Sequence, residues 1–294
     1  MTNRFWPEFY TLSVARITVI GTGYVGLSTG ACLAHLGHLV TCADIDETKI
    51  ASLIAGKVPI VEDGLDALVF DGLSSGNLCF TTDVVGAAAT GEIVFLCLPT
   101  PQGDDGSADL SYVHSVVEQI GGILPVGAVL VNKSTVPVGT GAAVAARIGR
   151  DDVHIVSNPE FLRQGTAVHD FLHPSRVVVG GSNSDAVEKV AALYASVGAP
   201  ILRMNTASAE ALKYAANAFL ATKLTFINAM ADICEAVGAD IFEVATGIGL
   251  DPRIGKDMLN AGPGWGGSCF PKDTRALVSI AADGGYDFAL LRGV

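Results

Sequence analysis

The stretch RITVIGTGYVGLSTGACLAHLGHLVTCAD, residues 16 to 44, decides the fold of this chain. Residues 16–20 (RITVI) indicate a short buried strand, and the glycine-rich GTGYVG at 21–26 follows it at once. A helix continues through 31–36, Gly37 ends it, and residues 39–43 (LVTCA) form a second strand that stops at Asp44. A strand, a glycine turn, a helix and a second strand in this order predict one βαβ unit of a parallel sheet.

Further apolar, β-type segments follow downstream, and alanine-rich helical stretches separate most of them. These segments are residues 93–98, 129–131, 154–156, 176–179 and 201–204. Strands that alternate with helices predict an α/β fold, a doubly wound, parallel, Rossmann-type sheet covered on both faces. We expect this domain to span residues 16–205, after an unstructured leader at residues 1–15.

The character of the chain changes after residue 205. Residues 208–237 contain no proline or glycine, with Ser208 as the expected N-cap and Gly238 as the stop. Such a helix is about 45 Å long, too long for one small sheet, and therefore bridges domains or subunits. Shorter helices are expected at 241–246 and from Pro271 to about residue 282. We expect residues 206–294 to form an all-helical domain that carries a cysteine loop.

Composition excludes several classes of protein. Hydrophobic residues make up 50% and charged residues 16% of the 294 residues, which is typical of a globular chain with a large core. The formal net charge of −12 argues against a nucleic-acid or anionic-membrane surface, so a phosphate ligand needs a local site. No apolar run reaches the roughly 18 residues of a membrane span, and the N-terminus lacks the pattern of a signal peptide.

The cysteines and histidines give no sign of a disulfide framework or a metal site. Six cysteines are scattered without a CxxC pair, which favours reduced thiols in the cytoplasm. Five of them fall inside apolar strand or helix patterns and are expected to be buried; Cys269 does not. The six histidines show no ligand spacing, so we expect no metal.

The glycine turn has the context of a dinucleotide site. Gly21 allows the tight turn, Gly23 lets backbone approach a pyrophosphate, and Gly26 allows close packing of helix on strand. Asp44 ends the next strand, 18 residues beyond Gly26. Its carboxylate can accept from both ribose hydroxyls and would repel a 2′-phosphate, which favours NAD over NADP. The alternative is an ordinary tight turn.

Neighbouring segments supply further candidates for the cofactor site. Lys49, one turn after Asp44, is either a ribose contact or a solvated lysine. Pro99 and Thr100 follow the 93–98 strand, and Thr135 lies in KSTVPVGT (133–140) after the next strand. Because ligands of doubly wound sheets sit at the carboxyl ends of strands, we expect both loops to face the cofactor. Turn chemistry alone is the alternative.

A second group of candidates centres on GPGWGGSCFPKD, residues 262–273. Cys269 lies two residues before Pro271, at the positive end of the expected helix, a placement that favours the reactive thiolate. The glycines before it let backbone pack against a ligand. Cys269 is therefore either a nucleophile or a structural cysteine.

Three further polar residues, Lys213, Asn217 and Glu160, each allow two interpretations. Lys213 and Asn217 are four apart on the long helix and share one face, either as a surface pair or as an oxyanion-binding pair. Glu160 follows a strand end in SNPE, where a carboxylate either activates water or is a solvated turn residue.

Taken in order, these motifs resemble the UDP-glucose/GDP-mannose dehydrogenase family, most of all its bacterial UDP-glucose dehydrogenases. The resemblance runs from about residue 16 to the end of the chain and rests on GTGYVGL, LPTP, KSTVPVGT, NPEFLRQGTAVHDFLHPSRVVVGG, the helix KYAANAFLATKLTFINAMADICE and GWGGSCFPKD. Simple hydroxyacid dehydrogenases share the glycine turn but lack GGSCFPKD.

The resemblance implies a four-electron oxidation of UDP-glucose by two NAD and one water. Cys269 would attack the intermediate aldehyde, and loss of hydride would leave a thioester. By the same resemblance, Lys213 and Asn217 steady an oxyanion, Asp273 assists with a bound water, and Glu160 and Thr135 position the hydrolytic water. It also assigns Tyr24, Val25 and Lys272 to the cofactor site, and Phe161, Leu162, Gly264, Gly266 and Gly267 to the substrate site.

Two departures from the family pattern qualify this expectation. Gln164 stands where family members usually carry glutamate, so a proton-transfer role there is lost. Family members also continue into a C-terminal nucleotide-sugar domain that we expect to be absent here. The alternatives are a non-catalytic NAD-binding dimer, a two-electron hydroxyacid dehydrogenase, or an enzyme for another nucleotide sugar such as GDP-mannose or a UDP-N-acetylhexosamine. A homodimer through helix 208–237 is expected because that helix leaves an apolar face uncovered.

Overall fold

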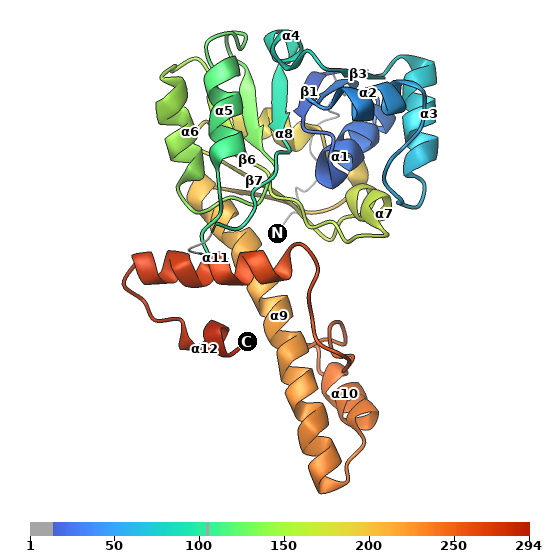
Figure 1. Cartoon of the computed structure of the whole chain (residues 1–294), viewed down its shortest axis with the longest axis vertical. Helices are drawn as coiled ribbons and strands as arrows, with labels where there is room; N and C mark the ends of the chain where they lie inside the picture. The colour runs from blue at the N-terminus through green and yellow to red at the C-terminus, as the bar shows by residue number, and fades with distance from the viewer. Residues whose placement is uncertain (1–13, 104–105) are drawn as a thin grey trace, which may run out of the picture. The chain divides into compact units, whose positions relative to one another are not determined.

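The computed structural model describes residues 14–103 and 106–294, and most of the predicted leader lies outside the described residues. The chain divides into two compact units. Of the described residues, unit 1 comprises 14–100 and 110–210, and unit 2 comprises 101–103, 106–109 and 211–294. The chain order of their helices and strands can be followed by colour in Figure 1.

Unit 1 is built on one sheet, which within the described residues has eight strands in the order β3-β2-β1-β4-β5-β6-β7-β8. The strands are β1 Arg16–Ile20, β2 Leu39–Ala43, β3 Leu78–Thr81, β4 Ile93–Leu96, β5 Val129–Asn132, β6 His154–Ser157, β7 Val177–Gly181 and β8 Ile201–Met204. The order reverses beside β1, which makes the carboxyl ends of β1 and β4 the switch point where ligands of such sheets bind. The predicted Rossmann-type α/β fold is confirmed.

The sheet is not wholly parallel, which corrects the prediction. The strands β6 and β7 pair antiparallel, with Val156 opposite Gly181, whereas the other neighbouring pairs are parallel. A parallel neighbour needs a crossover that returns the chain to the opposite edge of the sheet. The helix between these strands, α7, has only six residues, about 9 Å, and does not return it.

The edge strand β3, LCFT, was not predicted. It has four residues, and its burial alternates between buried and more exposed positions. The strands β4 and β5 are equally short, but they are buried at every position, and their apolar runs marked them as strands. Four alternating residues do not distinguish a strand from a loop.

The helices of unit 1 lie between the strands in sequence, as the pattern predicts. They are α1 Tyr24–His35, α2 Glu47–Ile54, α3 Leu65–Ser75, α4 Val84–Thr90, α5 Ser111–Ile120, α6 Thr140–Ile148, α7 Ala167–Leu172 and α8 Ser184–Ala192, with a 3₁₀ turn at Ala195–Val197. The first turn of α9 also belongs to this unit.

Two apolar cores cover the two faces of the sheet. In β4, Phe95 enters one core while Val94 and Leu96 enter the other, as expected when successive side chains point to opposite faces. The first core is shared with α1, α2, α3, α7 and α8, and the second with α4, α5 and α6. Buried on both faces, the central strands hold their carboxyl-terminal loops in fixed positions.

Unit 2 is mainly helical. Its elements are α9 Thr206–Val237 from residue 211 onward, α10 Ile241–Gly249, α11 Phe270–Asp283, α12 Ala289–Gly293 and a bridge between Gln102 and Ala108. The 32-residue α9 is about 48 Å long, and it is the long orange helix of Figure 1. Among the described helices, none is both long and apolar enough to span a membrane.

The N-cap of α9 differs from the prediction. The helix begins at Thr206, and the Asn205 side chain accepts a hydrogen bond from the backbone N–H of Ser208 at 2.7 Å. Asn205 is therefore the cap, and Ser208, the predicted cap, lies inside the first turn. The predicted start of α11 is confirmed, with Pro271 in its first turn.

Candidate functional site

The glycine turn after β1 has the geometry that a tight strand-to-helix connection requires. Gly21 has φ +96°, and a Cβ there would lie 2.4 Å from the carbonyl oxygen of Cys97. A Cβ on Gly26 would lie 1.8 Å from the carbonyl oxygen of Gly21. Gly23 differs, because nothing lies within 4 Å of the position that a Cβ would take there. The backbone at Gly23 is therefore open to a ligand, next to the partly exposed Tyr24 and Val25.

Asp44 lies against this turn at the end of β2. Its Oδ2 accepts hydrogen bonds from the Thr22 backbone N–H at 2.8 Å, the Thr22 hydroxyl at 2.7 Å and the Lys49 ammonium at 2.9 Å. Burial alone raises the pKa of Asp44, but the hydrogen bonds from Thr22, Lys49 and Asp46 outweigh it and lower the pKa to about 2. Asp44 is thus an ionised acceptor at neutral pH.

These residues fit a bound NAD. An open glycine at a helix start suits a pyrophosphate, and an ionised carboxylate at the end of the second strand suits ribose hydroxyls and opposes a 2′-phosphate. Lys49 is paired with Asp44, so it is not the freely solvated lysine of the alternative interpretation. Thr22 was missed by the sequence analysis, although its place between the first two glycines could have identified it.

A hydrogen bond joins the two loops that were expected to face the cofactor, those of Thr100 and Thr135. The Thr100 hydroxyl donates to the carbonyl oxygen of Thr135 at 3.0 Å, and both residues are buried, whereas Pro99 is exposed. Thr100 follows β4 and Thr135 follows β5, which are parallel neighbours. Their loops therefore leave the same edge of the sheet as the glycine turn.

Glu160 follows β6, at the same edge. It is only 7% exposed, and its Oε2 accepts the backbone N–H of Leu162 at 2.7 Å. The interpretation of Glu160 as a solvated turn residue therefore does not hold. Next to it, the Phe161 ring lies under the Arg176 guanidinium, 3.9 Å from ring centroid to Cζ.

The second group of predicted residues lies in unit 2, around the start of α11. Cys269 is the N-cap residue of α11 and is exposed, as the prediction of a thiol at a helix start requires. Asp273, one turn later, is 1% exposed and accepts from the Asn217 side chain at 2.6 Å and from the Lys272 ammonium at 2.5 Å. Asn217, Lys272 and Asp273 thus form one hydrogen-bonded group within a turn of the thiol.

Lys213 and Asn217 are both buried, at 4% and 6% exposure. A surface pair is therefore excluded, and a polar pair on the buried face of α9 remains. The pairing of Asn217 with Asp273 was missed by the sequence analysis, because 56 residues separate them.

The glycine-rich loop before Cys269 is fixed to α9 at two points. The Trp265 ring N–H donates to the Thr225 hydroxyl at 2.8 Å, and the Gly262 backbone N–H donates to the Asn228 side chain at 2.9 Å. Between and after these points, Gly264 and Gly267 have φ +115° and +79°, values that favour glycine. Like Gly266, they have nothing within 4 Å of an added Cβ.

The remaining cysteines follow the prediction with one exception. Cys32, Cys42, Cys97 and Cys234 are buried, but Cys79 is exposed. Cys79 lies on the edge strand β3, at a position whose side chain turns away from the core. The prediction of a buried Cys79 was wrong because the edge strand has one open face.

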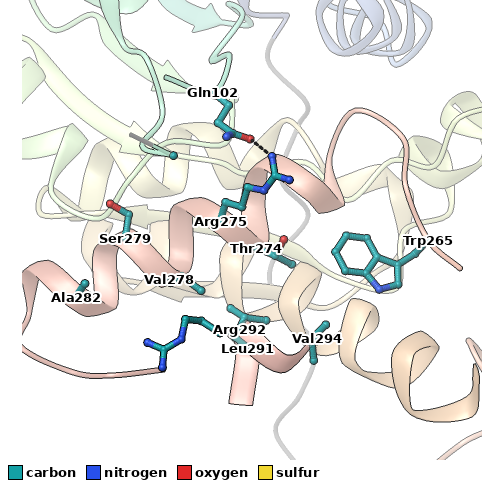
Figure 2. Close-up of a pocket in the computed structure, with 11 residues that line it drawn as sticks. Gln102, Trp265, Thr274, Arg275, Val278, Ser279, Ala282, Leu291, Arg292 and Val294 are labelled. Atoms are coloured by element: carbon teal, nitrogen blue, oxygen red, sulfur yellow. Dashed lines mark hydrogen bonds between the residues drawn. The ribbon is translucent and has the colours of Figure 1, made fainter. Parts of the chain in front are cut away.

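A cavity of about 730 Å³ lies elsewhere in unit 2, on α11. Figure 2 shows its lining, in which Arg275 donates to the Gln102 side chain at 3.2 Å. Trp265 and Leu291 also line it, but no predicted catalytic, cofactor or substrate residue does. The cavity therefore borders the predicted site without including its residues, since Trp265 lies in the glycine-rich loop and Thr274 follows Asp273.

Comparison with known proteins gives the same family for both parts of the chain. Residues 15–198 match the UDP-glucose/GDP-mannose dehydrogenase family, NAD binding domain, and residues 207–294 match the central domain of that family. The chain is 49% identical to UDP-glucose 6-dehydrogenase TuaD of Bacillus subtilis (strain 168), covering 95% of this chain and 62% of that protein. It is 51% identical to UDP-glucose 6-dehydrogenase of Rhizobium meliloti (strain 1021), covering 91% and 64%.

A solved structure agrees over nearly the whole chain. The UDP-glucose dehydrogenase from the archaeon Pyrobaculum islandicum matches with a TM-score of 0.91 at 37% identity, covering 98% of this chain and 68% of that one. The chain spans 62% and 64% of the length of the two curated relatives above.

Proposed function

This chain belongs to the UDP-glucose/GDP-mannose dehydrogenase family, and on that premise we propose that it takes part in the NAD-dependent oxidation of UDP-glucose to UDP-glucuronate. The observation that carries the proposal is the exposed Cys269 at the start of α11, one turn from the buried Asn217–Asp273 pair and its partner Lys272. A thiol and a fixed carboxylate in this arrangement suit acyl chemistry at an aldehyde, which a two-electron dehydrogenase does not need.

The proposed reaction converts UDP-glucose, two NAD⁺ and one water into UDP-glucuronate, two NADH and protons. NAD, when bound, accepts a hydride in each of the two oxidations. Between them, the Cys269 sulfur bonds to the C6 aldehyde and forms a thiohemiacetal. Loss of hydride from that carbon leaves a thioester, and water cleaves the carbon–sulfur bond to give the acid and the free thiol.

The polar residues of unit 2 are proposed to manage the oxygen atom at C6. Lys213 and Asn217 project from the buried face of α9, where donors stabilise a developing oxyanion more strongly than in bulk water. Asp273, held by Asn217 and Lys272, accepts a proton through a bound water. Glu160 and Thr135, on adjacent loops of unit 1, are proposed to position the hydrolytic water.

The test mixes the protein with NAD and UDP-glucose and measures NADH and sugar acid. We expect two NADH for each UDP-glucuronate. Replacing Cys269 by alanine should lower the rate of acid formation by at least about 1000-fold, as loss of a covalent nucleophile does in other enzymes. Cys79→Ala, at an exposed cysteine of unit 1 outside the proposed site, is the control and should leave the rate within a few-fold. Unchanged NADH formation by Cys269→Ala, with one NADH per sugar and no acid, would instead support a two-electron dehydrogenase.

The same assay distinguishes the remaining functional alternatives. NAD binding without turnover would indicate a non-catalytic NAD-binding protein. The same assay with one of the longer relatives would then show that the conditions support turnover. GDP-mannose and UDP-N-acetylhexosamines serve as competing substrates, since a GDP-mannose dehydrogenase structure from Pseudomonas aeruginosa also matches, at 35% identity and a TM-score of 0.78. We propose UDP-glucose because it is named in the relatives of 46–51% identity.

We further propose a cytoplasmic homodimer. The described cysteines are all free, which suits a reducing compartment. On α9, Phe219, Phe226 and Ile233 are 65%, 52% and 51% exposed and recur every seven residues. This spacing places them on one stripe of the helix, which a second copy of the chain would cover.

A further inference from the structure

The loop at residues 159–166, between β6 and α7, carries Glu160, which the proposed function assigns to the hydrolytic water. It also carries Phe161 and Leu162, which the family resemblance assigns to the substrate site. A loop of this kind has no strand partner for its backbone, so its N–H groups need other acceptors. Three carboxylates supply them, and all of the contacts lie within unit 1.

Glu62 makes the longest-range of these contacts. One carboxylate oxygen accepts the backbone N–H of Gly165 at 2.6 Å, and the other accepts that of Ala167 at 2.9 Å. Glu62 comes from the connection between α2 and α3, more than 100 residues earlier in the chain, and is 7% exposed. A buried glutamate with both oxygens used by backbone donors fixes the position of the segment it holds.

Tyr24 holds the same loop from the cofactor side. Its hydroxyl donates to the carbonyl oxygen of Arg163 at 2.7 Å. Burial, followed by the hydrogen bond and charge of Glu62, raises the pKa of Tyr24, so this hydroxyl remains a donor at neutral pH. Tyr24 is also the first residue of α1, directly after Gly23 of the glycine turn.

The other two carboxylates act locally. Glu160 accepts from the N–H of Leu162, and Asp170 accepts from the N–H of Arg163 at 2.9 Å and from its guanidinium. Each of these hydrogen bonds joins residues within seven positions of each other, so each shapes the loop without tying it to the rest of the unit. Glu62 and Tyr24, by contrast, tie the loop to distant segments.

We propose that Glu62 is a positioning residue of the sugar-oxidising site, which fixes the C-terminal end of the 159–166 loop to the connection between α2 and α3 so that Glu160, Phe161 and Leu162 are presented in one conformation. The role deepens the proposed function and rests on it for the identity of the ligand. Glu62 itself interacts with two backbone N–H groups and with the Tyr24 side chain, and it takes no part in bond making.

The chemistry of the site sets the choice of variant. Glutamine has the shape of glutamate, but only one of its two terminal atoms is an acceptor. In Glu62→Gln, one of the two N–H groups therefore faces an NH₂ donor and loses its partner. Asp63→Asn removes a carboxylate from the adjacent, exposed residue and is the matched control.

Hydrogen exchange tests the structural half of the proposal without any substrate. We expect Glu62→Gln to speed exchange at Gly165 and Ala167 at least tenfold, while the amides of the buried strand β5 keep their protection. Asp63→Asn should change neither. Unchanged protection of the Gly165 and Ala167 amides would overturn the proposal. An equal loss of protection in β5 would also overturn it, because Glu62 would then stabilise the whole unit and not this segment alone. If Glu62→Gln does not fold, Glu62→Asp, which withdraws the carboxylate by one methylene, takes its place.

Steady-state kinetics test the functional half. With UDP-glucose, we expect Glu62→Gln to raise KM for the sugar nucleotide at least tenfold and to leave the affinity for NAD within threefold. Equal KM values for Glu62→Gln and wild type, combined with faster exchange at the loop, would overturn the positioning role. Absence of UDP-glucose turnover in the wild type would count against the proposed function, whereas the exchange result still decides whether Glu62 holds the loop.

Discussion

At the scale of single residues, Asp44 joins cofactor recognition to the stability of unit 1. Four donor groups from Thr22, Lys49 and Asp46 converge on its carboxylate. They stabilise the ionised form, and the pKa falls from its usual 3.8 to about 2. The same charge that would accept from a ribose therefore also holds the glycine turn against the end of β2.

Replacing Asp44 by asparagine should weaken both functions. Loss of a charged acceptor is expected to raise the Kd for NAD about 10- to 100-fold, as measured by titration calorimetry. Asp46→Asn is the control, since asparagine also caps a helix well and Asp46 caps α2. An unchanged Kd in Asp44→Asn would contradict the assignment of Asp44 to the cofactor site.

The pH dependence of stability follows from the lowered pKa of Asp44. A group whose pKa is lower in the folded state stabilises the fold above its unfolded pKa, and that stabilisation is lost as the pH falls through the folded pKa. Allowing for partial screening by solvent, the contribution is about 1 to 2 kcal/mol at neutral pH. Wild type and Asp44→Asn should therefore differ in denaturant unfolding at pH 7, and the difference should shrink between about pH 4 and pH 2. A difference in unfolding free energy that stays constant across this pH range would contradict the lowered pKa of Asp44.

Individual residues were predictable from the sequence where a local pattern fixes their place. Asp44 and Cys269 stand at an end of a strand and the start of a helix, and both positions are visible in the sequence. Glu62 and the partnership of Asn217 with Asp273 were not predictable, because their partners are 56 to 105 residues away. A carboxylate that binds backbone amides also leaves no sequence signature in the segment that it holds.

At the scale of secondary-structure elements, the turn between β1 and α1 separates two roles of glycine. In Gly26→Ala, the new Cβ would meet the Gly21 carbonyl oxygen at 1.8 Å, a contact with backbone that cannot move aside. We expect this variant to lose at least about 3 kcal/mol of folding free energy in denaturant unfolding. The helix α1 would otherwise have to move away from the sheet.

Gly23→Ala is the matched variant, since the added methyl meets nothing within 4 Å and φ at Gly23 is −71°. Its stability should stay within about 0.5 kcal/mol of wild type. Its Kd for NAD should rise at least tenfold, because the methyl occupies the space where a pyrophosphate would approach the backbone. Equal NAD affinity in Gly23→Ala and wild type would place the phosphates elsewhere.

The first turn of α9 gives a prediction that follows from a corrected cap. Asn205→Ala removes the acceptor of the Ser208 N–H and should cost about 1 kcal/mol in denaturant unfolding. Ser208→Ala, at the position that the sequence predicted as the cap, should have an effect within about 0.5 kcal/mol. A larger loss for Ser208→Ala than for Asn205→Ala would reverse the assignment.

Elements with an uninterrupted pattern were the predictable ones. The apolar runs of β4 and β5, buried at every position, and the unbroken helix α9 were visible in the sequence. The edge strand β3 has the same length as β4 and β5, but its burial alternates, and it was missed. The direction of β7 was missed because direction depends on how the chain returns between strands and not on the residues within them. The exposed Cys79 follows from the same omission, since only the position of β3 at an edge exposes it.

At the scale of the whole molecule, the proposed chemistry draws on both units. The cofactor candidates lie in unit 1, and the thiol with its buried acid lies in unit 2. The helix α9 is continuous through both, with its first turn in unit 1 and Lys213 and Asn217 in unit 2. Glu210, in that first turn, accepts from the backbone N–H groups of Gly139 and Gly141 at 2.7 and 2.8 Å, which anchors the start of α9 to the beginning of α6.

The exposed stripe of α9 leads to the prediction of a dimer. A single copy leaves Phe219, Phe226 and Ile233 more than half exposed, although each would gain free energy by leaving water. We expect wild-type protein to sediment as a dimer and Phe226→Asp as a monomer, because a charge in the middle of the stripe would be buried without a partner. Phe70→Asp replaces a phenylalanine on α3 that is 65% exposed, against 52% for Phe226, and should remain dimeric. The dimer would be contradicted if the wild-type protein sediments as a monomer at micromolar concentration. If Phe226→Asp remains a dimer, α9 is not part of the interface.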